Sequence, residues 1–408
     1  MKLDPKDHVW MTAPETRAVL TALGDARFVG GAVRNALMGR DVSEVDIATP
    51  LNPDEVIRRL KSAGIKAVPT GIDHGTITAV ANGKPFEVTT LRRDVETDGR
   101  RAVVAFTTDW TEDAQRRDFT MNALYASADG DVFDTVGGIE DLKAQHVRFV
   151  GDAVTRIRED YLRILRLFRF HAWYGRGEID SAALNAAAAE KSGLKGLSGE
   201  RVQKEMLRLL EASDPMPSLR AMAAAGILGD VLPGALNPAR LERLIAIDAD
   251  CFFQPDAVLR LSALLSSDGA SSALADKLKL SNAQRERLTD LAQVREKIVS
   301  YLSIREVRKL LYLLGPQRFR DRVFLKWAED PKASNTMQWR ALLALADSWQ
   351  RPKFPLTGES VMAAGVPRGP LIGRILGEVE EWWIDSDFID DEFSLAERLK
   401  AVVQATAY

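Results

Sequence analysis

The stretches FVGGAVRN at residues 28–35 and EVDIAT at residues 44–49 decide the fold class of the first part of this chain. Gly30 and Gly31 stand between a short apolar strand, predicted over 26–29, and a helix, predicted over 32–38. Glycines at such a turn let a phosphate approach the backbone N–H groups at the start of a helix. The pattern therefore predicts a strand–turn–helix unit that binds phosphate.

The second stretch is a predicted strand over 44–48 that carries two carboxylates. Residues i and i+2 of a strand point to the same face, so we expect Glu44 and Asp46 to lie side by side. Two carboxylates that close repel each other unless one is protonated or a cation lies between them. Oxygen ligands of this kind favour Mg²⁺. A metal beside a phosphate indicates nucleotidyl transfer.

Composition and charge restrict the classes of protein to which this chain can belong. The 408 residues allow two to four domains, and 55 basic against 58 acidic residues give a net charge of −3. Any nucleic-acid surface must therefore be local. The single cysteine, Cys251, excludes a disulfide framework within the chain and a cysteine-based zinc site. The first 11 residues lack a signal-peptide core, and no apolar run approaches the roughly 18 residues of a membrane helix. We expect a cytoplasmic protein that has no membrane partner.

Periodicity divides the chain into an α/β head and an all-helical remainder. Up to residue 150, short strands and helices alternate, and Asn82-Gly83 between strands predicted over 76–81 and 85–90 is a strong hairpin signal. Asn52-Pro53 predicts the cap and first turn of a helix that ends at Ala63. Residues 92–111 show no clear period and are interpreted as a long loop. From about Ala153 onward, helical apolar spacing dominates.

The predicted hairpin supplies a third carboxylate, Glu87, in an otherwise apolar strand. If its strand lies beside the one that carries Asp46, three carboxylates converge, as two Mg²⁺ ions would require for an in-line displacement at phosphorus. The alternative is an exposed glutamate on an edge strand.

A second constellation is EDYLR at residues 159–163, interpreted as the start of a helix. Asp160 and Arg163 are three residues apart, so they would be neighbours on one helix face. They could form an ordinary surface ion pair. Alternatively, a carboxylate that accepts hydrogen bonds and a guanidinium that donates them match the edges of cytosine and adenine, and they mismatch uracil and guanine.

Basic residues form a third group. Arg116 and Arg117 precede Asp118, and further arginines follow at positions 156, 158, 163, 166 and 169. Arginine suits bidentate phosphate contacts, although spaced arginines on a helix are also typical of a solvated face. Arg117 is the preferred triphosphate ligand because it lies close in sequence to the metal-bearing head.

Together these segments resemble the bacterial class II tRNA nucleotidyltransferases, which include CCA-adding enzymes and bacterial poly(A) polymerases. The motifs occur in order as GGAVR (30–34), VDIAT (45–49), RRDFTMNAL (116–124), DTVGG with DL (134–142), EDYLR (159–163), and ER with Glu205 (200–205). The resemblance is strong from residue 28 to about 205 and loose beyond that.

The resemblance implies a polymerase-β-like head with a small mixed sheet at 1–150, a helical neck with the nucleotide-selecting motif at 151–215, a helical body at 216–350 and a tRNA-binding helical tail at 351–408. Glu44, Asp46 and Glu87 would be the catalytic metal carboxylates. Arg100 and Arg101 would be contacts of a loop that supports A addition. The implied nucleotide-binding residues are Gly30, Gly31, Arg34, Arg117, Asp118, Asn122, Asp160, Arg163 and Arg166.

Two positions depart from the family pattern. The first metal carboxylate is usually aspartate, whereas this chain has Glu44, and GGxVR is usually followed by aspartate, whereas this chain has Asn35. An extra methylene can displace a metal by about an ångström, which can cost roughly 10²-fold in rate. Because both residues still offer oxygen, we expect activity.

The predicted function is template-independent addition of C and A to the tRNA 3′ end from CTP and ATP, with Mg²⁺ as cofactor, the tRNA acceptor arm as partner and no protein partner. A poly(A) polymerase shares the head motifs, but an acidic cluster at 378–392 stands where a basic RNA-binding extension would be expected. A tRNA-binding protein that has lost catalysis is a further alternative. A nucleotidyltransferase for a small molecule would not need the long helical remainder.

Overall fold

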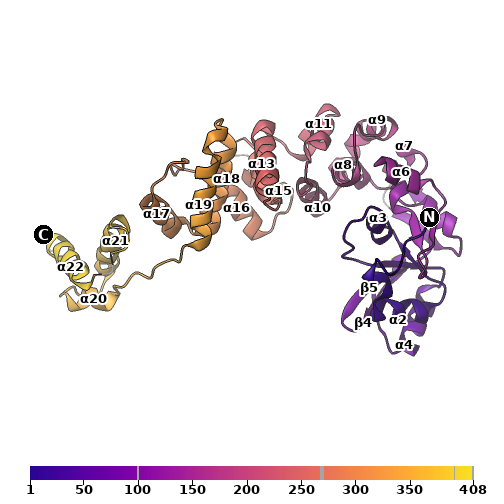
Figure 1. The fold of residues 1–408 in the computed structure, drawn as a ribbon, viewed down its shortest axis with the longest axis horizontal. Coiled ribbons are helices and arrows are strands. Elements are labelled where there is room, and N and C mark those ends of the chain that lie inside the picture. The colour runs from indigo at the N-terminus through magenta and orange to yellow at the C-terminus, as the bar shows by residue number, and fades with distance from the viewer. Residues whose placement is uncertain (99–100, 267–270, 390, 407–408) are drawn as a thin grey trace. The chain divides into compact units, whose positions relative to one another are not determined.

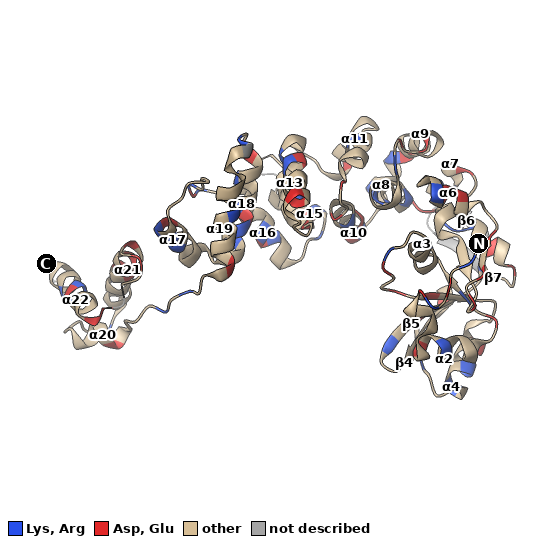
Figure 2. Ribbon diagram, in the orientation of Figure 1, with Lys and Arg blue, Asp and Glu red and all other residues tan. Residues whose placement is uncertain are grey.

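The computed structural model describes residues 1–98, 101–266, 271–389 and 391–406. It divides into two compact units. Unit 1 comprises Met1–Gly234 with Asp276–Leu280, and unit 2 comprises Ala235–Ala275 with Ser281–Tyr408. The predicted head and neck thus fall in one unit, and the finer domain boundaries remain predictions. Figure 2 shows acidic and basic residues interleaved along the ribbon of both units, as the near-balanced charge predicts.

The head is built on a seven-stranded mixed sheet with the order β3-β4-β5-β2-β1-β8-β9. Its one parallel pair among the described strands is β2 with β5. The strands are β1 (Arg27–Val29), β2 (Asp46–Thr49), β3 (Lys66–Gly71), β4 (Thr76–Ala81), β5 (Lys84–Thr90), β8 (Leu124–Ala126) and β9 (Val132–Asp134). The predicted mixed sheet is therefore confirmed.

The head also contains helices, several of which pack on the sheet and lie near it in Figure 1. They are α1 (Val9–Thr12), α2 (Pro14–Leu23), α3 (Gly31–Leu37), α4 (Pro53–Ser62), α5 (Trp110–Gln115) and α6 (Gly138–Ala144), with the 3-10 turns η1 (Ile72–His74) and η2 (Thr120–Asn122). The predicted cap is confirmed, because the Asn52 side chain accepts a hydrogen bond from the Glu55 N–H at 2.9 Å. The predicted hairpin turn is confirmed too, with Asn82 at φ +49° and Gly83 at φ +79°.

Unit 1 continues as helices. They are α7 (Ala153–Glu159), α8 (Leu162–Tyr174), α9 (Ser181–Glu190), η3 (Lys191–Gly196), α10 (Gly199–Leu210), α11 (Met216–Ala224) and α12 (Leu228–Val231). A helix does begin within residues 159–163, but only at Leu162, so the prediction that Asp160 and Arg163 lie on one helix face is wrong. The chain breaks between α7 and α8, where Asp160 has an extended backbone with φ −156° and ψ 106°.

The described part of unit 2 is helical apart from one isolated bridge between Leu236 and Leu265. With α15, which crosses the unit boundary, its helices are α13 (Pro238–Cys251), α14 (Ala257–Leu264), α15 (Ser271–Lys277), α16 (Asn282–Ala292), α17 (Ile304–Leu314), α18 (Pro316–Glu329), η4 (Ala333–Asn335), α19 (Thr336–Ser348), α20 (Gly358–Ala363), α21 (Pro370–Asp385) and α22 (Glu392–Thr406). None of the helices in the described ranges is long and apolar enough to cross a membrane.

The interpretation of residues 92–111 as a loop is wrong. This segment contains β6 (Arg92–Asp98) and β7 (Arg101–Phe106), which pair with each other as a separate two-stranded sheet. The chain leaves and rejoins the head at one place, where the Thr107 N–H donates to the Leu91 carbonyl at 3.0 Å. A pair of strands apart from the main sheet does not need the alternating apolar face from which strands are predicted.

Candidate active site

The parallel strand pair brings two predicted metal ligands together. Asp46 on β2 and Glu87 on β5 are direct register partners. Both also line one pocket with Glu44, which is exposed and lies before β2 rather than on it. The prediction that Glu44 belongs to the strand is therefore wrong, and residues 42–45 bring its side chain to the pocket instead.

The electrostatics of this pocket suit a cation. Burial raises the pKa of Asp46 to about 6, and repulsion from Glu87 and Glu44 adds to the rise, whereas Arg117 opposes it. No group of three or more His, Cys, Asp or Glu in the described ranges already has the arrangement of a metal site. The donor set nevertheless consists of carboxylate oxygens, the ligands that hard divalent cations take, so the residues fit such an ion.

Arg117 is positioned by Asp113, a carboxylate that we did not predict from the sequence. Asp113 is 1% exposed, and both Nε and Nη2 of Arg117 donate to its Oδ2, at 3.1 and 2.9 Å. Arg116 and the Tyr125 hydroxyl donate to the same carboxylate. Asp113 on α5 lies three and four residues before Arg116 and Arg117, which follow the end of that helix, and this helical spacing is a signal for the contact.

The double-glycine turn lies beside Arg117. Gly30 has φ +63°, and a Cβ there would lie 3.7 Å from the Asn122 carbonyl oxygen and 3.8 Å from Arg117 Nη1. Gly31 begins α3. The two distances at Gly30 are ordinary van der Waals contacts, so the positive φ is what favours glycine at position 30, and phosphate binding at this turn stays a prediction.

Arg34 connects the head to α8. It is 7% exposed and donates to the Asn122 side-chain oxygen and to the Tyr174 hydroxyl, the latter at 2.7 Å. Its guanidinium also lies 4.0 Å from the centre of the Tyr174 ring. Asn35 accepts from Arg34 Nε at 3.1 Å and from Nη2 at 2.9 Å. An amide oxygen can accept both bonds, without the added charge attraction of a carboxylate, so asparagine keeps the contact geometry at this position.

Asp118 forms a second link to α8. It is 9% exposed and accepts hydrogen bonds from Asn122 Nδ2 at 2.9 Å, from the Phe119 N–H at 2.8 Å and from two nitrogens of Arg166. Burial alone would raise the pKa of Asp118, but the charge and hydrogen bonds of Arg166 and the other donors lower it to about 2. Asn122 therefore bridges Arg34 and Asp118.

Asp160 and Arg163 do not form an ion pair with each other; each has another partner. Asp160 Oδ2 accepts from Arg201 on α10 at 2.7 Å, and its Oδ1 caps the Leu162 N–H at 3.1 Å. Arg163 pairs with Glu159 and donates to the Arg156 carbonyl at 2.8 Å. The two side chains are thus held separately, and although Arg201 belongs to the ER motif at 200–201, no local spacing predicts its bond to Asp160, 41 residues away.

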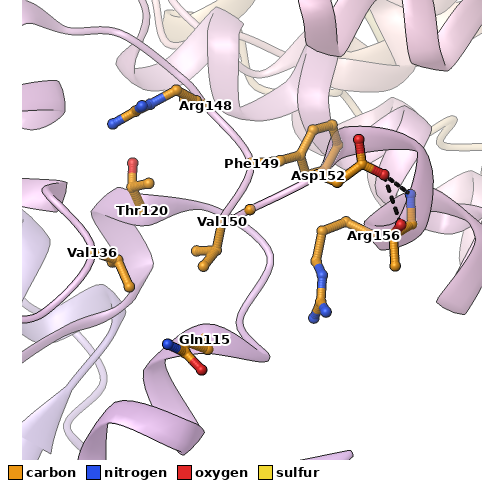
Figure 3. A pocket seen from close by; sticks show the side chains of 10 residues that line it. Gln115, Thr120, Val136, Arg148, Phe149, Val150, Asp152 and Arg156 are labelled. Carbon is orange, nitrogen blue, oxygen red and sulfur yellow. Dashed lines mark hydrogen bonds between the residues drawn. The ribbon is translucent and has the colours of Figure 1, made fainter. Parts of the chain in front are cut away.

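The two predicted loop contacts cannot be placed as side chains. Arg100 lies outside the described residues, and Arg101 is the first residue of β7. A further pocket, of about 510 Å³, lies where the head meets α7. Figure 3 shows Gln115 and Val136 on one side of it and Arg156 on the other. Of the described residues that line it, none is a predicted metal carboxylate, so the chemistry is assigned to the carboxylate pocket.

The comparisons with known proteins first define a class. Residues 26–148 match the poly A polymerase head domain, and residues 178–237 match the probable RNA and SrmB-binding site of polymerase A. A head of this class with paired carboxylates on a mixed sheet belongs to a nucleotidyltransferase, generally a metal-dependent enzyme.

Full-length relatives narrow this class to one family. The chain is 34% identical to the mitochondrial CCA tRNA nucleotidyltransferase 1 of Mus musculus, over 92% of this chain and 86% of that protein. It is 32% identical to the CCA-adding enzyme of Levilactobacillus brevis, over 91% and 92%. The Bacillus stearothermophilus CCA-adding enzyme in complex with CTP matches with a TM-score of 0.73 and 26% identity, over 96% of this chain and 98% of that one. The chain belongs to the family of CCA-adding tRNA nucleotidyltransferases.

Proposed function

We propose that this protein adds C and A nucleotides to the 3′ end of tRNA without a nucleic-acid template, taking them from CTP and ATP and releasing pyrophosphate. The observation that carries the chemical part of this proposal is the register pairing of Asp46 with Glu87 in the carboxylate pocket. Relatives that span over 90% of the chain are CCA-adding enzymes, which favours this function over poly(A) synthesis.

Asp46, Glu87 and Glu44 would hold Mg²⁺. When bound, Mg²⁺ supplies positive charge that stabilises the attacking and leaving oxygens of an in-line displacement. The 3′-hydroxyl oxygen of the tRNA bonds to the α-phosphorus, the bond from that phosphorus to the bridging oxygen breaks, and pyrophosphate leaves. The hydroxyl proton is lost to the surroundings.

Arg117 would bind the triphosphate of the incoming nucleotide. Its guanidinium is already fixed by Asp113, so little side-chain entropy is lost on binding. Gly30 forms a turn with φ +63° beside Arg117, and Gly31 begins α3 directly after it. Arg34, Asn122, Asp118 and Arg166 form the frame that keeps this turn next to α8.

Asp160 and Arg163 would select the base. Cytosine and adenine each present an amine donor beside a ring-nitrogen acceptor, which match a carboxylate and a guanidinium, whereas uracil and guanine present a carbonyl and an N–H instead. The Asp160 carboxylate is 34% exposed and so remains open to a ligand. A polar edge left unpaired in such a site can cost factors of roughly 10⁴ in specificity.

An incorporation assay tests this function. The protein is incubated with Mg²⁺ and tRNA that lacks its 3′ terminus, first with each labelled NTP alone and then with CTP and ATP together. We expect ordered addition of two C and one A. Long A-tails would indicate a poly(A) polymerase, and no incorporation would indicate an inactive tRNA-binding protein.

Variants in the same assay separate the two predicted roles. Asp46→Ala should abolish all incorporation, whereas Asp160→Ala should lose the choice between nucleotides. Asp129→Ala, at an exposed turn of the head, serves as the matched control and should behave as wild type. Full discrimination by Asp160→Ala would contradict the proposed selection.

A further inference from the structure

The proposed base-selecting carboxylate lies at a break in the helical structure. Asp160 falls between α7 and α8, and its extended backbone belongs to neither helix. Its Oδ1 caps α8 through the Leu162 N–H. A residue at such a break depends on tertiary contacts for its orientation, because intrahelical hydrogen bonds do not fix it.

One segment contacts the chain on both sides of this break. Before it, Arg158 Nε and Nη2 donate to Glu190 Oε1 at 3.0 and 2.7 Å. After it, the ring of Tyr161 packs on Gly193. We name residues 190–193, at the end of α9 and the start of η3, the 190–193 corner. Arg201 on the following helix α10 holds the Asp160 carboxylate itself.

The contact between Gly193 and Tyr161 leaves no room for a side chain. A Cβ on Gly193 would lie 2.0 Å from Tyr161 Cδ1 and 2.3 Å from Cε1 and Cγ. These distances are far below van der Waals contact, so the ring could not keep its place beside any residue larger than glycine. The glycine is needed here for close approach rather than for its backbone conformation.

The corner also contacts the residues that follow α11. Lys191 Nζ donates to the Ala225 carbonyl at 3.4 Å, just beyond the end of α11. A Cβ on Gly226 would lie 2.6 Å from the same nitrogen. The 190–193 corner is therefore fixed against α11 as well as against both ends of the break at Asp160.

We propose that Gly193 and Glu190 are positioning residues for nucleotide selection: they hold Tyr161 and Arg158, and thereby set where the Asp160 carboxylate points. Neither residue touches the nucleotide in this proposal. The inference rests on the proposed role of Asp160 and deepens it, because it assigns part of the specificity to a corner that lies outside the EDYLR motif.

The test is Gly193→Ala, with discrimination as the readout. Single additions of CTP and UTP to tRNA lacking CCA give kcat/KM for each, and ATP and GTP are compared on tRNA ending in CC. We expect the ratio of correct to incorrect nucleotide to fall by up to about a hundredfold, the scale of a misplacement of about 1 Å. Gly229→Ala is the matched control, because a Cβ at Gly229 meets nothing within 4 Å, and its ratio should equal that of wild type.

A double-variant cycle separates positioning from general damage. In the background of Tyr161→Ala, which removes Cγ and the whole ring, Gly193→Ala should change the ratio little, because the clash that it creates is gone. An equal fall in both backgrounds, or a wild-type ratio for Gly193→Ala, would overturn the proposal.

Glu190→Gln keeps the inference testable if Gly193→Ala does not fold. It removes only the charge that Arg158 pairs with, and we expect a smaller fall in the same ratio. An unchanged ratio for Glu190→Gln would overturn the part assigned to that residue. Asp160→Ala distinguishes failure of the proposed selection from failure of the proposed positioning. If Asp160→Ala keeps full discrimination between nucleotides, the proposed selection by Asp160 fails. If Asp160→Ala loses discrimination but Gly193→Ala keeps the wild-type ratio, only the positioning is refuted.

Discussion

The buried pair of Asp118 and Arg166 makes a quantitative prediction about stability. Asp118→Asn keeps the shape of the side chain and removes its charge. Arg166 on α8 would then lie beside a neutral amide in a site where the original carboxylate is only 9% exposed. Removing one partner of a buried, hydrogen-bonded ion pair is destabilising, because the other charge stays desolvated.

The pKa gives the size of this effect. The pKa of Asp118 is about 2 in the folded protein against an ordinary value of 3.8, a lowering of nearly 2 units. At about 1.4 kcal/mol per unit, the charged form contributes about 2–3 kcal/mol to folding. For a unit of more than 200 residues, this corresponds to a fall in Tm of roughly 5–10 °C.

The pH dependence follows from the direction of the shift. Because the folded pKa lies below the unfolded value, the stabilisation is fully present above pH 4 and disappears as the pH falls from about 4 to about 2. The difference in free energy of unfolding between wild type and Asp118→Asn should therefore be largest at pH 5–7 and shrink towards pH 3.

Urea unfolding of both proteins at pH 7, 5 and 3, followed by near-UV circular dichroism, measures this difference. Taking the difference between two variants cancels the titration of the other carboxylates. Asp131→Asn is the control, because the Asp131 side chain is 58% exposed and its ion pair with Lys2 should contribute less than about 1 kcal/mol. An Asp118→Asn protein as stable as wild type at pH 7, or a penalty that does not fall to about half at pH 3, would refute the reasoning.

Two further predictions concern the carboxylate pocket and the glycine turn. Glu44→Asp should keep incorporation within about tenfold of wild type, because Glu44 precedes β2 and its backbone can adjust. Asp46→Glu, at a position fixed by the register of the sheet, should lose roughly 10²-fold in kcat. Equal losses for the two variants would contradict this prediction. Gly30→Ala should raise KM for the nucleotides and lower the free energy of unfolding by about 1–2 kcal/mol, whereas Gly39→Ala, with a similar φ of +64° and nothing within 4 Å, should affect only stability. A rise in KM for Gly39→Ala as well would assign the effect to backbone strain.

Much of the head could be predicted from local patterns. The turn at Asn82-Gly83, the cap at Asn52 and the strand before Gly30 each have a short-range cause, and all are present. The hairpin at residues 92–106 had no such cause, because its strands pair only with each other. The break at Asp160 was also missed, since EDYLR has good helix formers on both sides, and a tertiary partner, Arg201, holds the residue out of the helix.

The candidate site was predictable in its residue types but not in its partners. Asp46 and Glu87 were expected to meet only on condition that their strands were neighbours, and the sheet order meets that condition. Interactions over long sequence separation, such as Arg34 with Tyr174, leave no periodic trace in the sequence. Asp113 is different, because its spacing of four residues to Arg117 is a local helical signal for their ion pair.

The hairpin of β6 and β7 has a consequence for how this head can be rebuilt. Its two ends meet at the hydrogen bond between Thr107 and Leu91, and its base is also tied by the Arg92 N–H to Asp113 at 3.0 Å. Because β6 and β7 pair with each other and not with the seven-stranded sheet, a hairpin of another length can replace them while the sheet keeps its own hydrogen bonds. The two ends of residues 92–106 are therefore the natural junctions for chimeric heads. At its base, each exchanged segment would contact Asp113, which also orients Arg117.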